Sequence, residues 1–198
     1  MEAYTYLLDR SLHNEKLYEI IKKNGNIDFP KNQDNLFDFL VKLVIKQQLS
    51  NNVAEKNWGR LIKYSSGNVF DFINSERSDI LSLCGISNQK KLSIIRLKEK
   101  FSVQDFDKNL FLGSTVEIKN KIISWYGFGE WSADMVCIFY LKNPDIWAVQ
   151  DSTLKKMKQY FNLSEEFIEL CSPYRSYLSL HLWKAVDDKL IIFSNKIL

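Results

Sequence analysis

The stretch 125-WYGFGEWSADMVCIF-139 places two glycines around a single phenylalanine, between segments of helical character. The chain has only 7 glycines in 198 residues, so the pair Gly127 and Gly129 stands out. Gly127 can adopt the left-handed conformation that ends a helix, and Gly129 can begin the next one. The free N–H groups of residues 129–132 would then form an anion site suited to a phosphate. Taken alone, the pattern is equally typical of a tight turn between two antiparallel helices.

Apolar residues recur at helical spacing along most of the chain. In 36-LFDFLVKLVIKQQLS-50 they form a stripe at i, i+3, i+4, i+7 and i+8, which predicts a helix buried on most sides. Similar patterns predict further helices over 53–66, 76–84, 87–101, 114–127, 132–141, after Asp151, and over 174–190. The sequence therefore predicts an all-α protein of about eight to ten helices, a compact bundle with two lobes and a groove between them.

Composition narrows the class of protein. A hydrophobic content of 45% and a charged content of 26% are those of an ordinary globular chain, and a net charge of +3 permits a nucleic-acid partner without requiring one. Cys84, Cys137 and Cys171 lie far apart, which disfavours a disulfide framework, a zinc site and an iron–sulfur cluster, and predicts reduced thiols in a cytosol. We expect neither a signal peptide nor a membrane span, and we interpret the apolar tail 189–198 as the end of a packed helix.

Four strings, in this order along residues 36–190, resemble the helix-hairpin-helix DNA glycosylase superfamily, and within it the 3-methyladenine DNA glycosylase II branch. Gly-Phe-Gly-Glu-Trp-Ser-Ala is similar to the branch's Gly-Ile-Gly-x-Trp-Thr-Ala, and an aspartate follows it in 144-PDIWAVQD-151. The others are 45-IKQQLSNNVA-54, which resembles a helix end with two glutamines, 85-GISNQKKLSIIRL-97, which resembles Gly-(Ile/Leu)-Ser-x-x-Lys, and 173-PYRSYLSLHLW-183, which resembles a Pro-Trp-Arg-Ser-Tyr helix.

The resemblance implies one glycosylase domain over residues 1–198, with the hairpin at about 115–142 and a DNA-binding cleft between the lobes. It also implies a monomer without the N-terminal β-rich domain that some members carry. The partner would be double-stranded DNA with alkylated bases of the 3-methyladenine and 7-methylguanine type, in base excision repair. The location would be the cytoplasm, with the nucleoid, in a bacterium, or the nucleus in a eukaryote.

The resemblance assigns the catalytic carboxylate to Asp151. A carboxylate beside the sugar can stabilise an oxocarbenium-like transition state and orient or deprotonate water. An aspartate before Ser152-Thr153-Leu154 also fits a helix N-cap, and the two roles are compatible. Bifunctional relatives carry a nucleophilic lysine where this chain has Trp131, so we expect a monofunctional enzyme that leaves the strand intact.

The resemblance also assigns residues that contact the DNA. Trp131 and Trp183 would line the base pocket, where an indole face attracts a cationic alkylated base. Gln48 would be the wedge that fills the gap left by the flipped base, with Leu49 as the alternative. The hairpin amides of Gly127, Gly129 and Trp131 would contact a phosphate, to which a monovalent cation on the hairpin carbonyls can bridge, and no cofactor is required. The lysines considered as phosphate neighbours are Lys90, Lys91, Lys155 and Lys156.

The chain departs from the branch pattern near Val149, where proline is common, and at Tyr174, where tryptophan is common; both departures concern substrate range. Three alternatives stay open: a glycosylase for an oxidised or deaminated base, a non-catalytic binder of damaged DNA, and a helical protein-interaction module.

Overall fold

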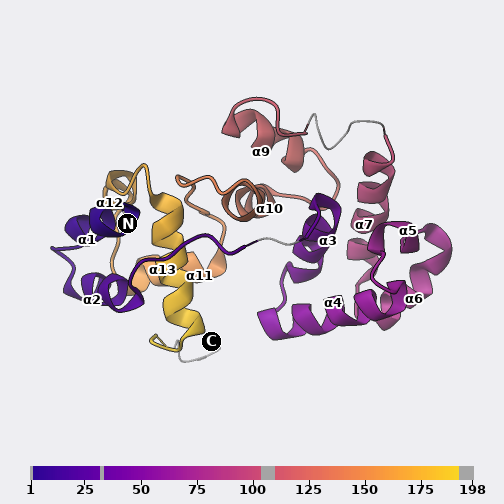
Figure 1. The fold of residues 1–198 in the computed structure, drawn as a ribbon, viewed down its shortest axis with the longest axis horizontal. Helices are drawn as coiled ribbons and strands as arrows, with labels where there is room; N and C mark the ends of the chain where they lie inside the picture. The colour runs from indigo at the N-terminus through magenta and orange to yellow at the C-terminus, as the bar shows by residue number, and fades with distance from the viewer. Residues whose placement is uncertain (1, 32–33, 104–109, 192–198) are drawn as a thin grey trace. The chain divides into compact units, whose positions relative to one another are not determined.

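The computed structural model describes residues 2–31, 34–103 and 110–191, and in these ranges it is helical without strands (Figure 1). This confirms the predicted all-α class. The chain separates into two compact units, one of Asn32–Val136 and one that joins Met1–Lys31 to Cys137–Leu198. We call them the hairpin unit and the aspartate unit. They correspond to the two predicted lobes, while a cleft between them and the single-domain organisation stay predictions.

The hairpin unit is built around α3 (Leu36–Lys46), whose predicted stripe supplies the fully buried Leu40 and Val44; Val41, outside that stripe, is fully buried as well. Asn35 caps this helix by accepting a hydrogen bond from the Asp38 N–H. Against α3 pack α4, α5, α7 and α10. The other elements of the unit are α4 (Asn51–Ser65), α5 (Val69–Phe72), η1 (Ser75–Arg77), α6 (Ser78–Leu83), α7 (Asn88–Phe101), α9 (Thr115–Ile123) and α10 (Glu130–Met135).

The aspartate unit is built around α13 (Arg175–Asp187), which packs against the first two helices of the chain and against α11. Its side chains are buried on several faces, so it shows little of the one-sided pattern of a surface helix. The other elements are α1 (Glu2–Arg10), α2 (Glu15–Asn24), α11 (Ser152–Tyr160) and α12 (Glu165–Leu170). One π-helical turn, η2 (Val136–Tyr140), continues directly from α10.

Several helices end earlier than their apolar patterns predict. Helix α3 stops at Lys46, because Gln48 adopts a left-handed backbone with φ of 58°. The predicted helix 174–190 ends at Asp187, and Lys189 is again left-handed, with φ of 56°. The interpretation of the tail as the end of a packed helix is therefore wrong for residues 189–191, and 192–198 lie outside the described residues. The described residues hold twelve α-helices, more than the eight to ten predicted. Helices as short as α5 are too short to show a periodic pattern of apolar residues in the sequence.

A buried histidine links α13 to the end of α2. His181 is 1% exposed, its Nδ1 lies 3.3 Å from Asn24 Nδ2, and its backbone carbonyl accepts a hydrogen bond of 2.9 Å from the same amide. Burial disfavours the charged imidazolium and lowers the pKa of His181 to about 4. Because the ordinary value is 6.5, the unfolded chain binds an extra proton between pH 6.5 and pH 4.

Acid should therefore destabilise the fold through His181. The free energy of unfolding has its full value with respect to His181 above pH 6.5 and falls as the pH is lowered toward 4. We expect the free energy of unfolding to fall by about 2 kcal/mol between pH 7 and pH 5. Urea unfolding at the two pH values should show this loss in the wild type and a smaller one in His181→Gln. The exposed histidine provides the control: His13→Gln should keep the wild-type dependence, and an equal flattening in both variants would contradict the assignment.

Candidate active site and hairpin

Asp151 lies at the N-cap of α11, as the Asp-Ser-Thr-Leu string predicts. Its Oδ1 accepts a hydrogen bond from the Leu154 N–H at 2.9 Å. The carboxylate therefore meets the positive end of the helix dipole, which favours a negative charge there. The Asp151 side chain is partly exposed.

Trp183 approaches the same carboxylate from α13. Its Nε1 donates a hydrogen bond of 3.0 Å to Asp151 Oδ1, and its ring lies 5.5 Å from that of Phe139 at an angle of 31°. Two N–H groups thus converge on one oxygen and fix the orientation of the carboxylate. The structure brings Asp151 and Trp183 together, and it adds an orienting hydrogen bond that the sequence did not predict for Trp183.

The hairpin joins α9 to α10 through residues 124–129, within the predicted range of about 115–142. Helix α9 begins at a capping box in which Ser114 and Glu117 bond each other's backbone N–H groups. The phenylalanine between the glycines, Phe128, is 6% exposed and packs edge-on against Trp125 at 5.5 Å. The turn is therefore held by its own small apolar contact.

Gly127 and Gly129 differ in backbone conformation and in the space beside them. Gly127 is left-handed, with φ of 82°, and a Cβ there would collide with the Ser93 hydroxyl of α7. Gly129 is extended, with φ of −127°, and is the N-cap of α10; a Cβ there would meet nothing within 4 Å. Trp131 follows in the first turn of α10 and is partly exposed. Gly127 is thus required by packing and conformation, whereas the chain itself leaves open space beside Gly129.

An ion pair crosses the hairpin and was not predicted. Lys119 Nζ of α9 lies 2.7 Å from Oδ1 of Asp134 on α10, a carboxylate that is 3% exposed. Burial raises the pKa of Asp134, and the Lys119 ammonium acts against that rise. An aspartate within the apolar run Ala133 to Cys137 was the available signal for such a buried pair.

The segment that carries the predicted wedge is tied to the hairpin. Gln47 Nε2 donates to the Gly127 carbonyl at 2.9 Å and lies 3.1 Å from Ser132 Oγ. Lys90 Nζ donates to the carbonyls of Ile45 and Gln47 at 2.8 and 2.6 Å, which satisfies the end of α3. Gln48 lies between these anchors, is exposed, and has a left-handed backbone conformation.

Two of the lysines considered as phosphate neighbours have structural partners instead. The Lys90 ammonium binds the two carbonyls just named, and its burial lowers the pKa of the amine. Lys91 is 8% exposed and donates to Ser82 Oγ at 2.8 Å. Lys155 and Lys156 are exposed on α11, where Lys155 bonds Gln150. The expectation for Lys91 is therefore wrong, because its side chain is buried. Lys90 is partly exposed, and its role as a phosphate neighbour stays a prediction.

The part of the chain that the structure describes contains neither a membrane-spanning helix nor a cluster of metal-binding side chains. No helix in it is long and apolar enough to cross a membrane. No group of three or more His, Cys, Asp or Glu side chains in it has an arrangement that could hold a metal ion. Cys84, Cys137 and Cys171 are buried, and none of the three forms a disulfide.

No protein-family model matches the chain. The chain is 22% identical to DNA-3-methyladenine glycosylase 1 of Schizosaccharomyces pombe, over 92% of this chain and 89% of that protein. It is 23% identical to the DNA-3-methyladenine glycosylase of Saccharomyces cerevisiae, over 85% of this chain and 74% of that protein.

Among solved structures, the fold matches 3-methyladenine DNA glycosylase Mag1 of Schizosaccharomyces pombe in complex with abasic DNA, with a TM-score of 0.78. The match has 21% identity and covers 94% of this chain and 97% of that one. The chain is thus similar in sequence to 3-methyladenine DNA glycosylases, and it shares the fold of Mag1.

Proposed function

We propose that the protein is a DNA glycosylase that flips alkylated bases out of duplex DNA and removes them by hydrolysis, as the first step of base excision repair. The observation that carries the proposal is the Asp151 carboxylate, oriented by Leu154 and Trp183 in a chain that also holds the hairpin. Its relatives support it, because they are named DNA-3-methyladenine glycosylases and the Mag1 structure is a complex with abasic DNA, the product of such a reaction.

In the proposed reaction the bond between base and deoxyribose lengthens first, and positive charge develops on the sugar. Asp151 would stabilise that charge and orient or deprotonate the attacking water. Because Leu154 and Trp183 both hold Oδ1, the carboxylate is oriented before the substrate arrives. An N3- or N7-alkylated purine already carries a positive charge and leaves without strong protonation, so water is the only other reactant needed.

Substrate choice would come from the two tryptophans. An indole face attracts a cation by about 1 kcal/mol or more when water is excluded, and this favours charged over neutral bases. We assign Trp131 and Trp183 to the base pocket, with Trp183 held at a fixed distance from the carboxylate by its N–H. Such a pocket selects charge more than shape and would accept 3-methyladenine and 7-methylguanine alike.

The contacts to the DNA backbone are proposed for the hairpin. The N–H groups that follow Gly129 would bind a phosphate at the open side of the turn, and a monovalent cation on the hairpin carbonyls would bridge to it. Gln48 would enter the duplex as the wedge. Its exposure and left-handed backbone support this role, because strained and exposed residues gather at functional sites.

The test is to incubate the protein with a methylated DNA duplex and identify the bases released by mass spectrometry. We expect 3-methyladenine and 7-methylguanine, an intact abasic strand and no covalent complex after borohydride treatment, since Trp131 cannot form a Schiff base. Tight binding to the duplex without release would instead indicate a non-catalytic binder. Parallel duplexes with oxidised or deaminated bases test the other glycosylase class, which base release from these duplexes alone would indicate.

A further inference from the structure

The first turn of α13 is bonded to the chain segment that leads to Asp151. Ser176 is fully buried, and its hydroxyl accepts from the Ile146 N–H at 2.9 Å and donates to the Ile146 carbonyl at 3.2 Å. The Ser176 N–H also donates to the Pro144 carbonyl at 2.9 Å. A single serine therefore binds the Pro144 carbonyl and both backbone groups of Ile146. We call residues 144–146 the anchored end of the segment 144–151.

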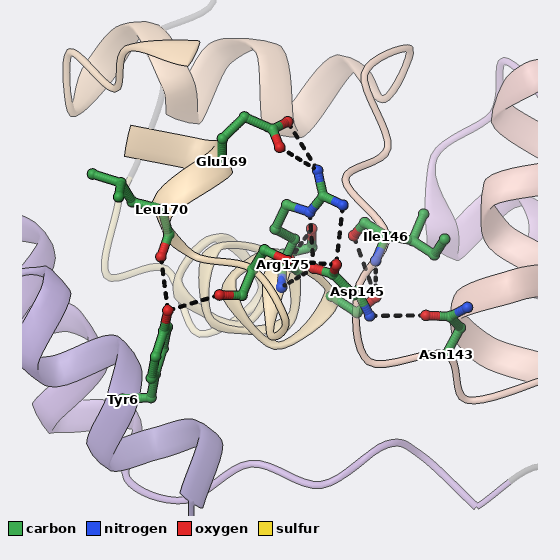
Figure 2. Close-up of polar contacts among 10 residues, drawn as sticks. Tyr6, Asn143, Asp145, Ile146, Glu169, Leu170 and Arg175 are labelled. Carbon is green, nitrogen blue, oxygen red and sulfur yellow. Dashed lines mark hydrogen bonds and ion pairs between the residues drawn. The ribbon is translucent and has the colours of Figure 1, made fainter. Parts of the chain in front are cut away.

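A charged contact reinforces the same end (Figure 2). Arg175 makes a bidentate contact with Asp145, in which Nε donates to Oδ1 at 2.8 Å and Nη2 donates to Oδ2 at 3.0 Å. Ser172 Oγ also donates to Oδ2 of Asp145, at 2.8 Å. The remaining guanidinium nitrogen bonds both carboxylate oxygens of Glu169, at 2.9 and 3.0 Å. Burial alone would raise the pKa of Asp145, but the hydrogen bonds from Arg175 and Ser172 outweigh it and leave the pKa below its ordinary value.

The other end of the segment is held by the same helix. Trp183, which binds Asp151, follows Arg175 by eight positions, or roughly 12 Å along an α-helix. Helix α13 thus contacts the segment near its start through Arg175 and Ser176, and at its end through Trp183. A turn closes in between, where the Asp151 N–H donates to the Ala148 carbonyl at 2.9 Å.

We propose that Arg175 and Ser176 are positioning residues that place the Asp151 carboxylate through the segment 144–151. The inference rests on the proposed function, because it concerns the residue that function makes catalytic. A shift of about 1 Å in a reacting group, caused by a change away from the chemistry, can lower a rate by about 100-fold. The anchored end lies five positions before Asp151, close enough for a loss of register there to move the carboxylate.

The experiment compares two serines of one helix. Ser176→Ala removes the two side-chain hydrogen bonds to Ile146. Ser179→Ala removes an equally buried hydroxyl that donates only to a carbonyl of its own helix, that of Arg175, at 3.1 Å. For each variant we would measure the single-turnover rate of base release at saturating protein, the Kd for abasic-site DNA and the free energy of unfolding.

Ser176→Ala should release base about 10- to 100-fold more slowly, with Kd unchanged within about twofold, whereas Ser179→Ala should keep the wild-type rate. Arg175→Lys keeps the positive charge but loses the bidentate contact with Asp145, and should also lower the rate of base release at unchanged Kd. A purely structural role would change the stability of both serine variants and leave the rate per folded molecule intact, which would overturn the proposal. If the wild type itself releases no base, the proposed function is wrong. This result differs from an active wild type with unchanged variants, which would contradict only the positioning role of Arg175 and Ser176.

Discussion

Replacement of Asp151 by asparagine is expected to lower base release from methylated DNA by about 100-fold or more, with the fold and the DNA affinity retained. Asparagine is as good an N-cap as aspartate, so its Oδ1 can still accept the Leu154 N–H and the Trp183 Nε1–H. The variant removes only the negative charge and the basic oxygen. The charge near the sugar is what the proposed transition state requires.

Asp188→Asn is the matched control, because it makes the same change of charge on an exposed residue of the same unit. We expect wild-type rates from it. The measurement is a single-turnover assay together with binding to abasic-site DNA and the thermal unfolding midpoint. Full excision by Asp151→Asn would show that another group carries the chemistry, whereas loss of both binding and folding would leave the charge argument without support.

The elements that the sequence predicts best are those determined by local signals. The stripe of α3 and the asparagine before it required no tertiary information, and neither did the Ser114–Glu117 capping box. The aspartate before Ser152 is recognisable as a cap in the same way. Helix ends were less predictable, because Gln48 and Lys189 adopt left-handed backbones for which their residue types give no warning.

The contacts that build the site depend on long-range packing instead. Trp183 lies 32 positions after Asp151, and its hydrogen bond depends on the rotation of α13 against α11. The packing of α1 and α2 against α13 joins the two ends of the chain, which no periodic pattern reveals. Lys90 and Lys91 look like surface cations in the sequence, but their ammonium groups find carbonyl and hydroxyl partners only once α7 is placed.

The hairpin glycines provide the second large effect. Gly127→Ala should destabilise the protein by about 3 kcal/mol, because a left-handed alanine is strained and its Cβ would lie 2.7 Å from Ser93 Cβ. Gly129→Ala should cost less than about 1 kcal/mol, because its φ of −127° suits any residue and the site is open. Urea unfolding of the two variants measures the difference directly.

The same pair separates a structural glycine from one that DNA requires. If a phosphate approaches the N-terminus of α10 closely, the methyl group of Gly129→Ala will occupy that space and weaken binding to abasic-site DNA by about tenfold. Wild-type affinity in Gly129→Ala would remove Gly129 from the proposed backbone contacts. For Gly127, the double variant Ser93→Ala/Gly127→Ala removes the colliding hydroxyl but not the left-handed strain, so it should recover only part of the lost stability. Complete recovery would mean that the backbone at Gly127 tolerates a side chain, and that packing against α7 alone requires glycine there.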